Sequence, residues 1–373
     1  MSAVGPLLPQ LALQTGSTLA AVGAFFTVLS FGQVVSQVVG GPASDRLGPR
    51  PAILVGLALV ALGVEGIGIS NSLLTFLGST LVAGLGYGAA DIGINLLIAS
   101  AFARRRVSAL NLLHLFWGLG ATIGPAAVGL SFSLWSSGTP ALWPAVFLPA
   151  FLLPITYRLR PGLAARAPAS SSSAEPVYRS PLLWALAGML AVSVGIEIGT
   201  GGWTTSYLMA TTEASFEMAA LVTSGYWMAL SAGRVISTLL GTRVGPRVIL
   251  GLDVAGACAA SMGMIAGLGN WPLSVAATLT MGLSIGSMYP TTVALVTAAF
   301  KSGPGRAASV VMASTNVTSM TLPWLQGLLF IGLGPASSTW FVASCSVIML
   351  VLYACSQALQ ARSRPREGAL RER

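Results

Sequence analysis

Charge is what this sequence has least of. Aspartate, glutamate, lysine and arginine make up 8% of the 373 residues, whereas hydrophobic residues make up 54%. A soluble domain carries roughly a quarter of charged residues to cover its surface. Apolar runs of about 18 residues or more, the length that crosses a bilayer, instead recur from end to end. We therefore predict an all-α polytopic membrane protein that lies in a lipid bilayer.

Residues typical of catalytic and metal sites are also scarce. The sequence holds one histidine and three cysteines. Cys258, Cys345 and Cys355 all lie in apolar runs, so neither a disulfide framework nor a metal cluster is predicted. No Ser/His/Asp set, metal-ligand spacing or phosphate-binding loop stands out. We therefore expect neither an enzyme nor a cofactor.

The few positive charges follow a membrane pattern. A formal net charge of +9 would suit a nucleic-acid partner, but the positions of the charges exclude one. Apart from Arg234, the lysines and arginines gather in the C-terminal tail and in alternate connections, near residues 46, 104, 160, 243 and 301. Positively charged loops stay on the cytoplasmic side of a membrane. These connections and the C-terminus are therefore predicted to be cytoplasmic in a multi-pass protein of the cell membrane.

The apolar runs fall into two sets. Residues 1–158 form an N-terminal half and residues 181–360 a C-terminal half, with a basic, Pro/Ser-rich linker at 159–180 and a basic tail at 361–373. Residues 1–13 are apolar but too short to span the bilayer. The predicted spans are 17–40, 51–70, 73–102, 107–133, 139–158, 181–210, 214–240, 248–269, 272–300, 306–333 and 337–359.

The two halves repeat each other. Thr80–Gly88 matches Thr278–Gly286, and matches elsewhere in the halves share nearly the same spacing. A constant spacing predicts two six-helix halves related by a pseudo-two-fold axis, with a site near the membrane midplane, which is a transporter plan. By the same repeat, the helix that starts near Pro181 should have a partner that begins upstream of Met1. The first helix is therefore expected to be truncated at its N-terminus.

A polar stretch of ten residues, 41–50, separates the first two long apolar runs. Gly41 and Gly48 allow a tight reversal and a close helix approach. Asp45 can face a helix N-terminus or an arginine, and Arg46 and Arg50 hold the turn on the cytoplasmic side. The pattern G-x-x-x-D-R-x-G-x-R resembles the loop between the second and third helices of the major facilitator superfamily. This resemblance implies that the stretch biases a cytoplasmic gate; a plain basic turn is the alternative.

Asp91 is the sharpest candidate for chemistry. An ionisable group inside the hydrocarbon costs about 2.5–3.5 kcal/mol on insertion scales, so each one needs a reason. Gly84, Gly88, Asp91 and Asn95 fall on one face of the helix predicted at 73–102. The glycines let a neighbouring helix or a solute come close. We predict that Asp91 takes up and releases a proton while Asn95 contacts the solute; an acid satisfied by a neighbouring side chain is the alternative.

Glu197 is a second acid inside a predicted span, and it shares the proton-coupling prediction with Asp91. Trp203 follows it on the same helix. An indole can stack on the apolar face of a sugar ring, or it can belong to the aromatic belt at the membrane interface. Both interpretations of Trp203 remain open.

Further polar groups complete the predicted solute contacts. Asn111 and His114 share one face of the helix at 107–133, with Trp117 beside them. His114 either shuttles protons or is a hydrogen-bonded packing residue. Tyr289 and Asn316 lie in the C-terminal half, and core packing is an equal alternative for Asn316.

Two charged residues lie at similar depth near the cytoplasmic ends of neighbouring helices. Arg234 and Asp253 each sit about two turns inside the predicted spans at 214–240 and 248–269. A mutual ion pair with a structural or gating role is the interpretation that this equal depth favours.

Three stretches resemble the fucose permease branch of the major facilitator superfamily: Asp91–Asn95, Asn111–Pro125, and Glu197–Tyr207 together with Gly225–Trp227 and Gly233–Arg234. In that branch the acid of the first segment is tied to proton coupling. The sequence departs from the branch at Gly5, which stands where an acidic residue would precede a segment like Leu7–Gln10. L-fucose itself is therefore not implied as the solute.

The resulting hypothesis is a secondary active transporter that moves a small solute, a monosaccharide, by proton symport with alternating access. The expected partners are the solute, protons and lipid, and the expected state, by resemblance, is a monomer. A drug/proton antiporter that exports amphipathic compounds is the alternative, because the segment from Gly120 to Pro125 partly resembles the signature of that class. Such an antiporter would need an aromatic- and Met-rich cavity, to which Met288, Tyr289 and Trp324 could contribute.

Overall fold

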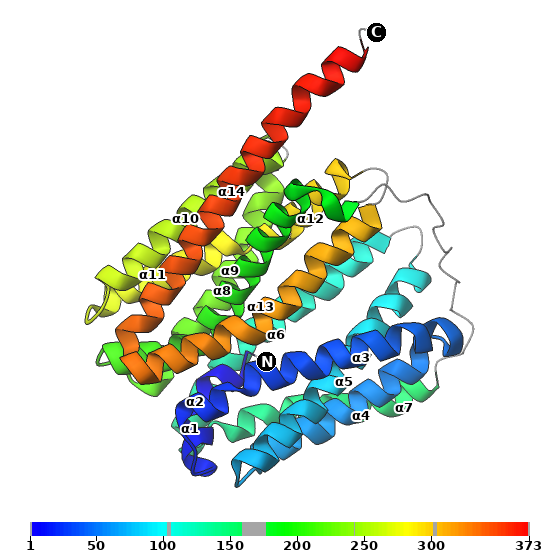
Figure 1. Cartoon of the computed structure of the whole chain (residues 1–373). Coiled ribbons are helices and arrows are strands. Elements are labelled where there is room, and N and C mark those ends of the chain that lie inside the picture. Colours follow the sequence, from blue (N-terminus) through cyan, green and yellow to red (C-terminus); the bar gives the residue numbers. More distant parts are fainter. Residues whose placement is uncertain (1, 103–105, 159–176, 242, 301–303, 372–373) are drawn as a thin grey trace. The chain divides into compact units, whose positions relative to one another are not determined.

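The computed structural model describes residues 2–102, 106–158, 177–241, 243–300 and 304–371, and these form helices joined by short connections (Figure 1). The first seven helices are α1 (Val4–Gln14), α2 (Leu19–Gly23), α3 (Phe25–Leu47), α4 (Pro49–Gly68), α5 (Leu73–Ala101), α6 (Arg106–Trp135) and α7 (Trp143–Tyr157). The other seven are α8 (Pro181–Thr211), α9 (Phe216–Leu240), α10 (Pro246–Ala266), α11 (Trp271–Ile285), α12 (Met288–Ala299), α13 (Pro304–Leu333) and α14 (Pro335–Arg371). Short 3₁₀ turns, Thr139–Leu142 and Val177–Arg179, precede α7 and α8.

Length and composition make this a multi-pass membrane protein. Within the described residues, nine helical segments are long and apolar enough to cross a membrane. Large apolar side chains such as Leu62 and Leu74 are 68% and 83% exposed, which a soluble surface avoids but lipid favours.

The chain divides into two compact units. The first comprises residues 1–169 together with 202–209 of α8 and 215–224 of α9; the second comprises the remainder, up to Arg373. The division therefore runs through α8 and α9, whereas the sequence places a boundary only in the linker. Within the first unit, Trp203 packs on Phe26 with ring centroids 6.2 Å apart, and Phe216 packs on Phe132 at 4.5 Å.

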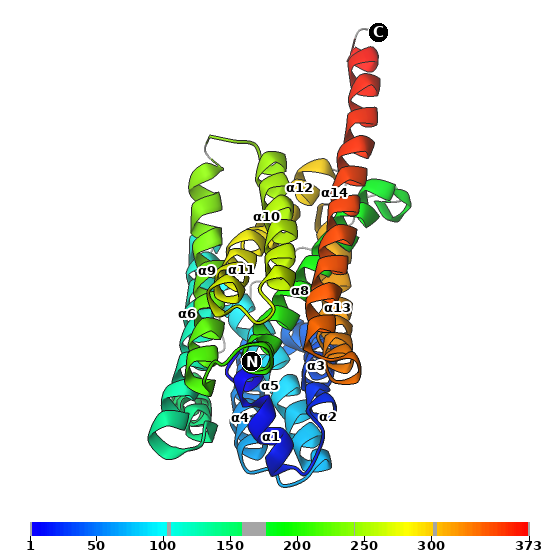
Figure 2. The ribbon, with the colours of Figure 1, turned by 90° about the vertical axis from the view of Figure 1, so that its left-hand side faces the viewer.

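Small residues let α3, α4 and α5 pack side by side in the first unit, as both views show (Figures 1 and 2). A Cβ on Gly63 of α4 would overlap the backbone nitrogen of Ala83 in α5. A Cβ on Gly88 of α5 would lie 2.6 Å from the carbonyl oxygen of Gln33 in α3. Close backbone approach through small residues is the usual basis of helix packing in membranes. Of the two roles that the sequence allows for the glycines near Asp91, the structure therefore shows contact with a neighbouring helix.

Hydroxyl groups and a small residue hold α8 to α13 in the second unit. Ser314 donates to the carbonyl oxygen of Ala187 at 3.2 Å, and Thr318 donates to that of Ala191. Gly195 leaves room for the side chain of Leu322. These contacts fix the rotation of α8 about its axis, and therefore which of its residues face the other neighbouring helices.

The predicted span at 272–300 is confirmed as one candidate membrane span, Trp271–Val296, but its helix is interrupted. α11 ends at Ile285 and α12 begins at Met288. Pro290 explains the break, because a proline lacks the N–H that would bond to the carbonyl four residues earlier and its ring clashes with that carbonyl. The carbonyl in question belongs to Gly286. Farther along the chain, α14 continues as a helix to Arg371, past its neighbour α10 (Figure 1).

Candidate functional site

The most polar part of the second unit lies along one face of α8. Ser193, Glu197 and Thr200 follow each other at intervals of four and three residues, so they share a face, and all are at most 6% exposed. The sequence prediction singled out only Glu197 from this stripe. Ser193 and Thr200 could have been predicted as well, because their spacing from Glu197 places them on the same face of the helix.

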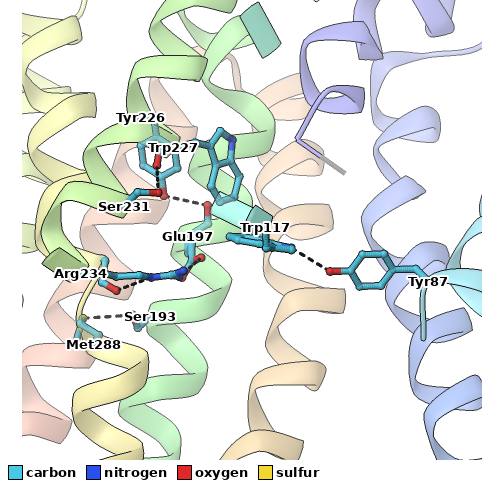
Figure 3. Close-up of polar contacts among 10 residues, drawn as sticks. Tyr87, Trp117, Ser193, Glu197, Tyr226, Trp227, Ser231, Arg234 and Met288 are labelled. Atoms are coloured by element: carbon cyan, nitrogen blue, oxygen red, sulfur yellow. Dashed lines mark hydrogen bonds and ion pairs between the residues drawn. The ribbon is translucent and has the colours of Figure 1, made fainter. Parts of the chain in front are cut away.

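Arg234 of α9 lies against Glu197. Its Nη2 is 3.6 Å from Oε1 of Glu197, and the two side chains are 30% and 8% exposed (Figure 3). The distance is that of an ion pair and exceeds a hydrogen bond. This finding corrects the predicted partner of Arg234, because the expected pair with Asp253 is replaced by the pair with Glu197.

The same arginine also binds the backbone at the break between α11 and α12. Its Nε donates a hydrogen bond of 3.1 Å to the carbonyl oxygen of Gly286. That carbonyl lacks its helical donor because Pro290 has no N–H. The guanidinium also stands at the C-terminus of α11, where the helix dipole favours a positive charge. Arg234 thus connects the acid on α8 to the helix break.

Asp253 of α10 contacts the break at Ser287, the residue that follows Gly286. Ser287 precedes the first turn of α12, and its hydroxyl donates to Oδ2 of Asp253. The carboxylate therefore lies near the N-terminus of α12, where the helix dipole favours a negative charge. Next along the chain, Met288 accepts a hydrogen bond of 3.3 Å from Ser193 (Figure 3). Side chains of three helices, α8, α9 and α10, therefore meet the two residues of the break and Met288, the first residue of α12.

Two aromatic residues cover the other end of the polar stripe. The hydroxyl of Tyr226 donates to the carbonyl oxygen of Glu197 at 3.0 Å, and the ring of Trp227 meets that of Tyr226 edge-on at 5.4 Å (Figure 3). Gly201 leaves room for the indole of Trp227. Tyr226 and Trp227 were not predicted as site residues, although the Gly-Tyr-Trp sequence is an aromatic pair in a predicted span.

The first unit holds the other predicted acid. The amide of Asn95 donates to Oδ1 of Asp91 at 2.9 Å and to the carbonyl oxygen of Asp91 at 2.8 Å. The two residues predicted to share a face of α5 therefore contact each other. One turn earlier, Tyr87 accepts a hydrogen bond of 3.0 Å from Nε1 of Trp117 on α6 (Figure 3). Tyr87 was not predicted.

Trp203 is a packing residue as well as a candidate. It is 1% exposed, lies against Phe26, and fills the space that the absent side chain of Gly23 leaves. A buried indole does not belong to the aromatic belt at the lipid interface, so that alternative is corrected. Contact with a solute stays a prediction.

Two of the residues predicted to bias the cytoplasmic gate, Gly48 and Arg50, lie in the part of the chain that the structure describes in detail. Gly48 ends α3 with a φ of 79°, a conformation that favours glycine. Arg50 stacks on the ring of Tyr157, with Cζ 4.9 Å from the centroid, and also donates to the carbonyl oxygen of Tyr157. It therefore caps the last turn of α7. For five other predicted gating and solute residues the structure describes the backbone alone: Gly41, Asp45, Arg46, Asn111 and His114.

The remaining candidates lie on α12 and α13. Tyr289 and Asn316 are both half-buried, and the carbonyl oxygen of Asn316 accepts from Ser319 at 2.9 Å. Of the residues expected in an antiporter cavity, Met288 is fully buried and Trp324 is 40% exposed. Their contact with a solute stays a prediction.

Comparison with known families decides what kind of protein this is. The sequence model of the Major Facilitator Superfamily matches residues 1–265 and, again, residues 198–372. The chain belongs to the Major Facilitator Superfamily. It is therefore a transporter and not an enzyme, and the predicted all-α major facilitator fold is confirmed.

Two solved structures share this fold. A mutant of the nucleoside transporter NupG matches with a TM-score of 0.78 and 14% identity, over 96% of this chain and 94% of that one. A mutant of the Escherichia coli fucose:proton symporter FucP matches with a TM-score of 0.61 and 17% identity, over 95% of each chain.

The curated relatives are distant. The chain is 22% identical to the sodium-dependent glucose transporter 1 of Danio rerio, over 88% of this chain and 61% of the relative. It is 28% identical to the multidrug resistance protein D of Escherichia coli strain K12, over 40% of this chain and 36% of the relative. The chain thus spans about three fifths of the length of the first relative and about one third of the second.

Proposed function

We propose that this protein is a symporter that couples the uptake of a monosaccharide to the inward flow of protons. The observation that carries the proposal is the buried ion pair of Glu197 and Arg234, joined to the broken helix at Gly286. Ionisable residues inside membrane spans mark solute or ion pathways, and discontinuous helices form the binding sites of many transporters.

The ion pair offers a route from proton uptake to helix movement. A proton on Glu197 removes the negative charge that faces Arg234. The guanidinium keeps its bond to the carbonyl oxygen of Gly286 but loses the attraction of the carboxylate, so the balance of contacts at the break changes. A small change at such a point can favour one of two helix arrangements, which is what a coupled transporter requires.

The solute class is supported by what the relatives are named for. The zebrafish relative is named a glucose transporter, and the two solved structures are a fucose symporter and a nucleoside transporter. All three kinds of solute contain a sugar ring.

The test is uptake of labelled monosaccharides and nucleosides into proteoliposomes. An inward proton gradient and an inward sodium gradient are imposed in separate arms, because the zebrafish relative is named sodium-dependent. Wild type is compared with Glu197→Gln and Asp91→Asn. Glu65→Gln is the matched control, since Glu65 is an exposed acid on α4.

We expect the proton gradient to drive uptake of one monosaccharide by wild type. Both site variants should lose this uptake, and Glu65→Gln should keep it. Uptake driven only by the sodium gradient would refute the proposed coupling to protons, although the protein would still be a symporter. Gradient-driven uptake that survives in both site variants would remove these acids from the mechanism.

A drug/proton antiporter is the second candidate, because the multidrug resistance protein is more similar in sequence where it matches. In the same liposomes it would release protons when lipophilic cations are added, and no sugar would enter.

A further inference from the structure

Tyr87 has a hydroxyl group whose proton has no acceptor among the described residues. The phenol oxygen accepts the N–H of Trp117 at 3.0 Å. An indole nitrogen only donates, so this bond uses a lone pair of the phenol and leaves the O–H free to donate. A donor without an acceptor is costly away from water, which means that such a group normally has a partner in the working protein.

The position of this hydroxyl is fixed from two helices. Tyr87 lies on α5 and Trp117 on α6, so the phenol oxygen is held between the helices (Figure 3). Both side chains are half-buried, and each keeps part of its surface accessible. The indole cannot turn the phenol away without losing its own acceptor. Trp117 therefore fixes the position of the phenol and leaves its O–H able to donate to another group.

The surroundings of Tyr87 are those of the proposed proton site. Asp91 lies four residues later, hence on the same face of α5, and its charge is near enough to act on Tyr87 electrostatically. Asn95 continues the same face and donates to Asp91. An aromatic ring, a free hydroxyl donor, an acid and an amide thus follow each other along about two turns of one helix.

We propose that Tyr87 is a specificity-determining residue, which donates its hydroxyl proton to an oxygen of the solute. Trp117 is the positioning residue that orients the phenol for this bond. The inference rests on the proposed uptake of a solute with a sugar ring, and adds to it a contact that no relative's name supplies. A donor with a fixed position selects among sugars, because a sugar without an oxygen at that point leaves the hydroxyl unpaired.

The test measures equilibrium binding of the transported sugar and its series of monodeoxy analogues to the full chain in detergent. The variants are Tyr87→Phe and Trp117→Phe. Tyr353→Phe is the matched control, since it also removes a hydroxyl that donates one bond inside the bundle, to the carbonyl oxygen of Arg247 at 3.0 Å. Melting temperatures of all variants separate loss of binding from loss of folding.

The expected result for Tyr87→Phe is a Kd for the parent sugar raised about 3- to 10-fold, the effect of losing one uncharged hydrogen bond. One deoxy analogue should bind wild type and Tyr87→Phe equally, because the bond is already absent. Trp117→Phe should reduce the preference for the parent sugar over this analogue, while Tyr353→Phe should leave it unchanged.

The inference is overturned if Tyr87→Phe behaves like Tyr353→Phe, or if it weakens every analogue by the same factor, which would indicate a purely structural role. If no monosaccharide or nucleoside binds to the wild type, the proposed function fails and this inference fails with it. If sugars bind and only the analogue pattern is missing, the proposed function stands and this inference alone is refuted.

Discussion

The pairing of Glu197 with Arg234 predicts how stability responds when either charge is removed. At 3.6 Å, two unit charges attract each other by about 5 kcal/mol at an effective dielectric constant of about 20. The loss of hydration on burial offsets part of this attraction. Removal of Arg234 leaves the buried carboxylate of Glu197 without its opposite charge, at a cost of about 3–5 kcal/mol. Removal of Glu197 should cost less, because the guanidinium keeps its bond to the carbonyl oxygen of Gly286.

A double-mutant cycle separates the pair from its surroundings. Glu197→Gln, Arg234→Met and the double variant are unfolded in mixed micelles with increasing sodium dodecyl sulfate, and the free energy of unfolding is compared with that of wild type. We expect the double variant to lose less than the sum of the two single losses, with a coupling energy of about 1–3 kcal/mol. The second substitution costs little once the pair is already broken.

The matched cycle uses the partner that the sequence suggested. Asp253→Asn combined with Arg234→Met should show a smaller coupling energy, because the hydroxyl of Ser287 donates to Asp253 and the ion pair of Arg234 is with Glu197. Additive losses in the Glu197 cycle, or a larger coupling in the Asp253 cycle, would refute the pairing on which the proposed mechanism depends.

Three further substitutions test other parts of the structure. Pro290→Ala gives Gly286 a helical donor again, so we expect the free energy of unfolding to rise by about 1–3 kcal/mol while the initial uptake rate falls; both are measured on one preparation. Gly63→Ala forces a Cβ onto the backbone of α5 and should cost about 1–3 kcal/mol, whereas Gly78→Ala, with no atom within 4 Å of its Cβ, should cost nothing. Arg50→Gln removes the cap and the ring contact at the end of α7, and a loss of about 1 kcal/mol in detergent unfolding is expected.

The membrane helices were predictable because lipid imposes a simple rule. A span must be long and apolar, and an acid within it is costly enough to stand out. Asp91 and Glu197 were found by that rule, and the structure places each in a polar contact. The fold follows from the same rule together with the internal repeat.

The partner of Arg234 was not predictable in the same way. Position in the sequence gives the depth of a residue in the membrane, and Arg234 and Asp253 were paired because their depths agree. Depth says nothing about the direction in which a side chain leaves its helix. That direction depends on the rotation of each helix, which is set by packing such as the approach of Gly233 in α9 to the backbone of α11. The guanidinium therefore meets Glu197 although the sequence suggested another acid.

Pro290 was visible in the sequence, but its consequence was underestimated because membrane bundles tolerate proline when a neighbour satisfies the freed carbonyl. The structure shows which neighbour does so. The donor for Gly286 is Arg234, a charged side chain that also holds an acid. Had the donor been a serine or a water molecule, the break would be a passive kink. Because the donor is shared with Glu197, any change of charge on that acid alters the backbone contact at the break, so the residues that tolerate the proline are the same residues that can couple an ion to helix movement.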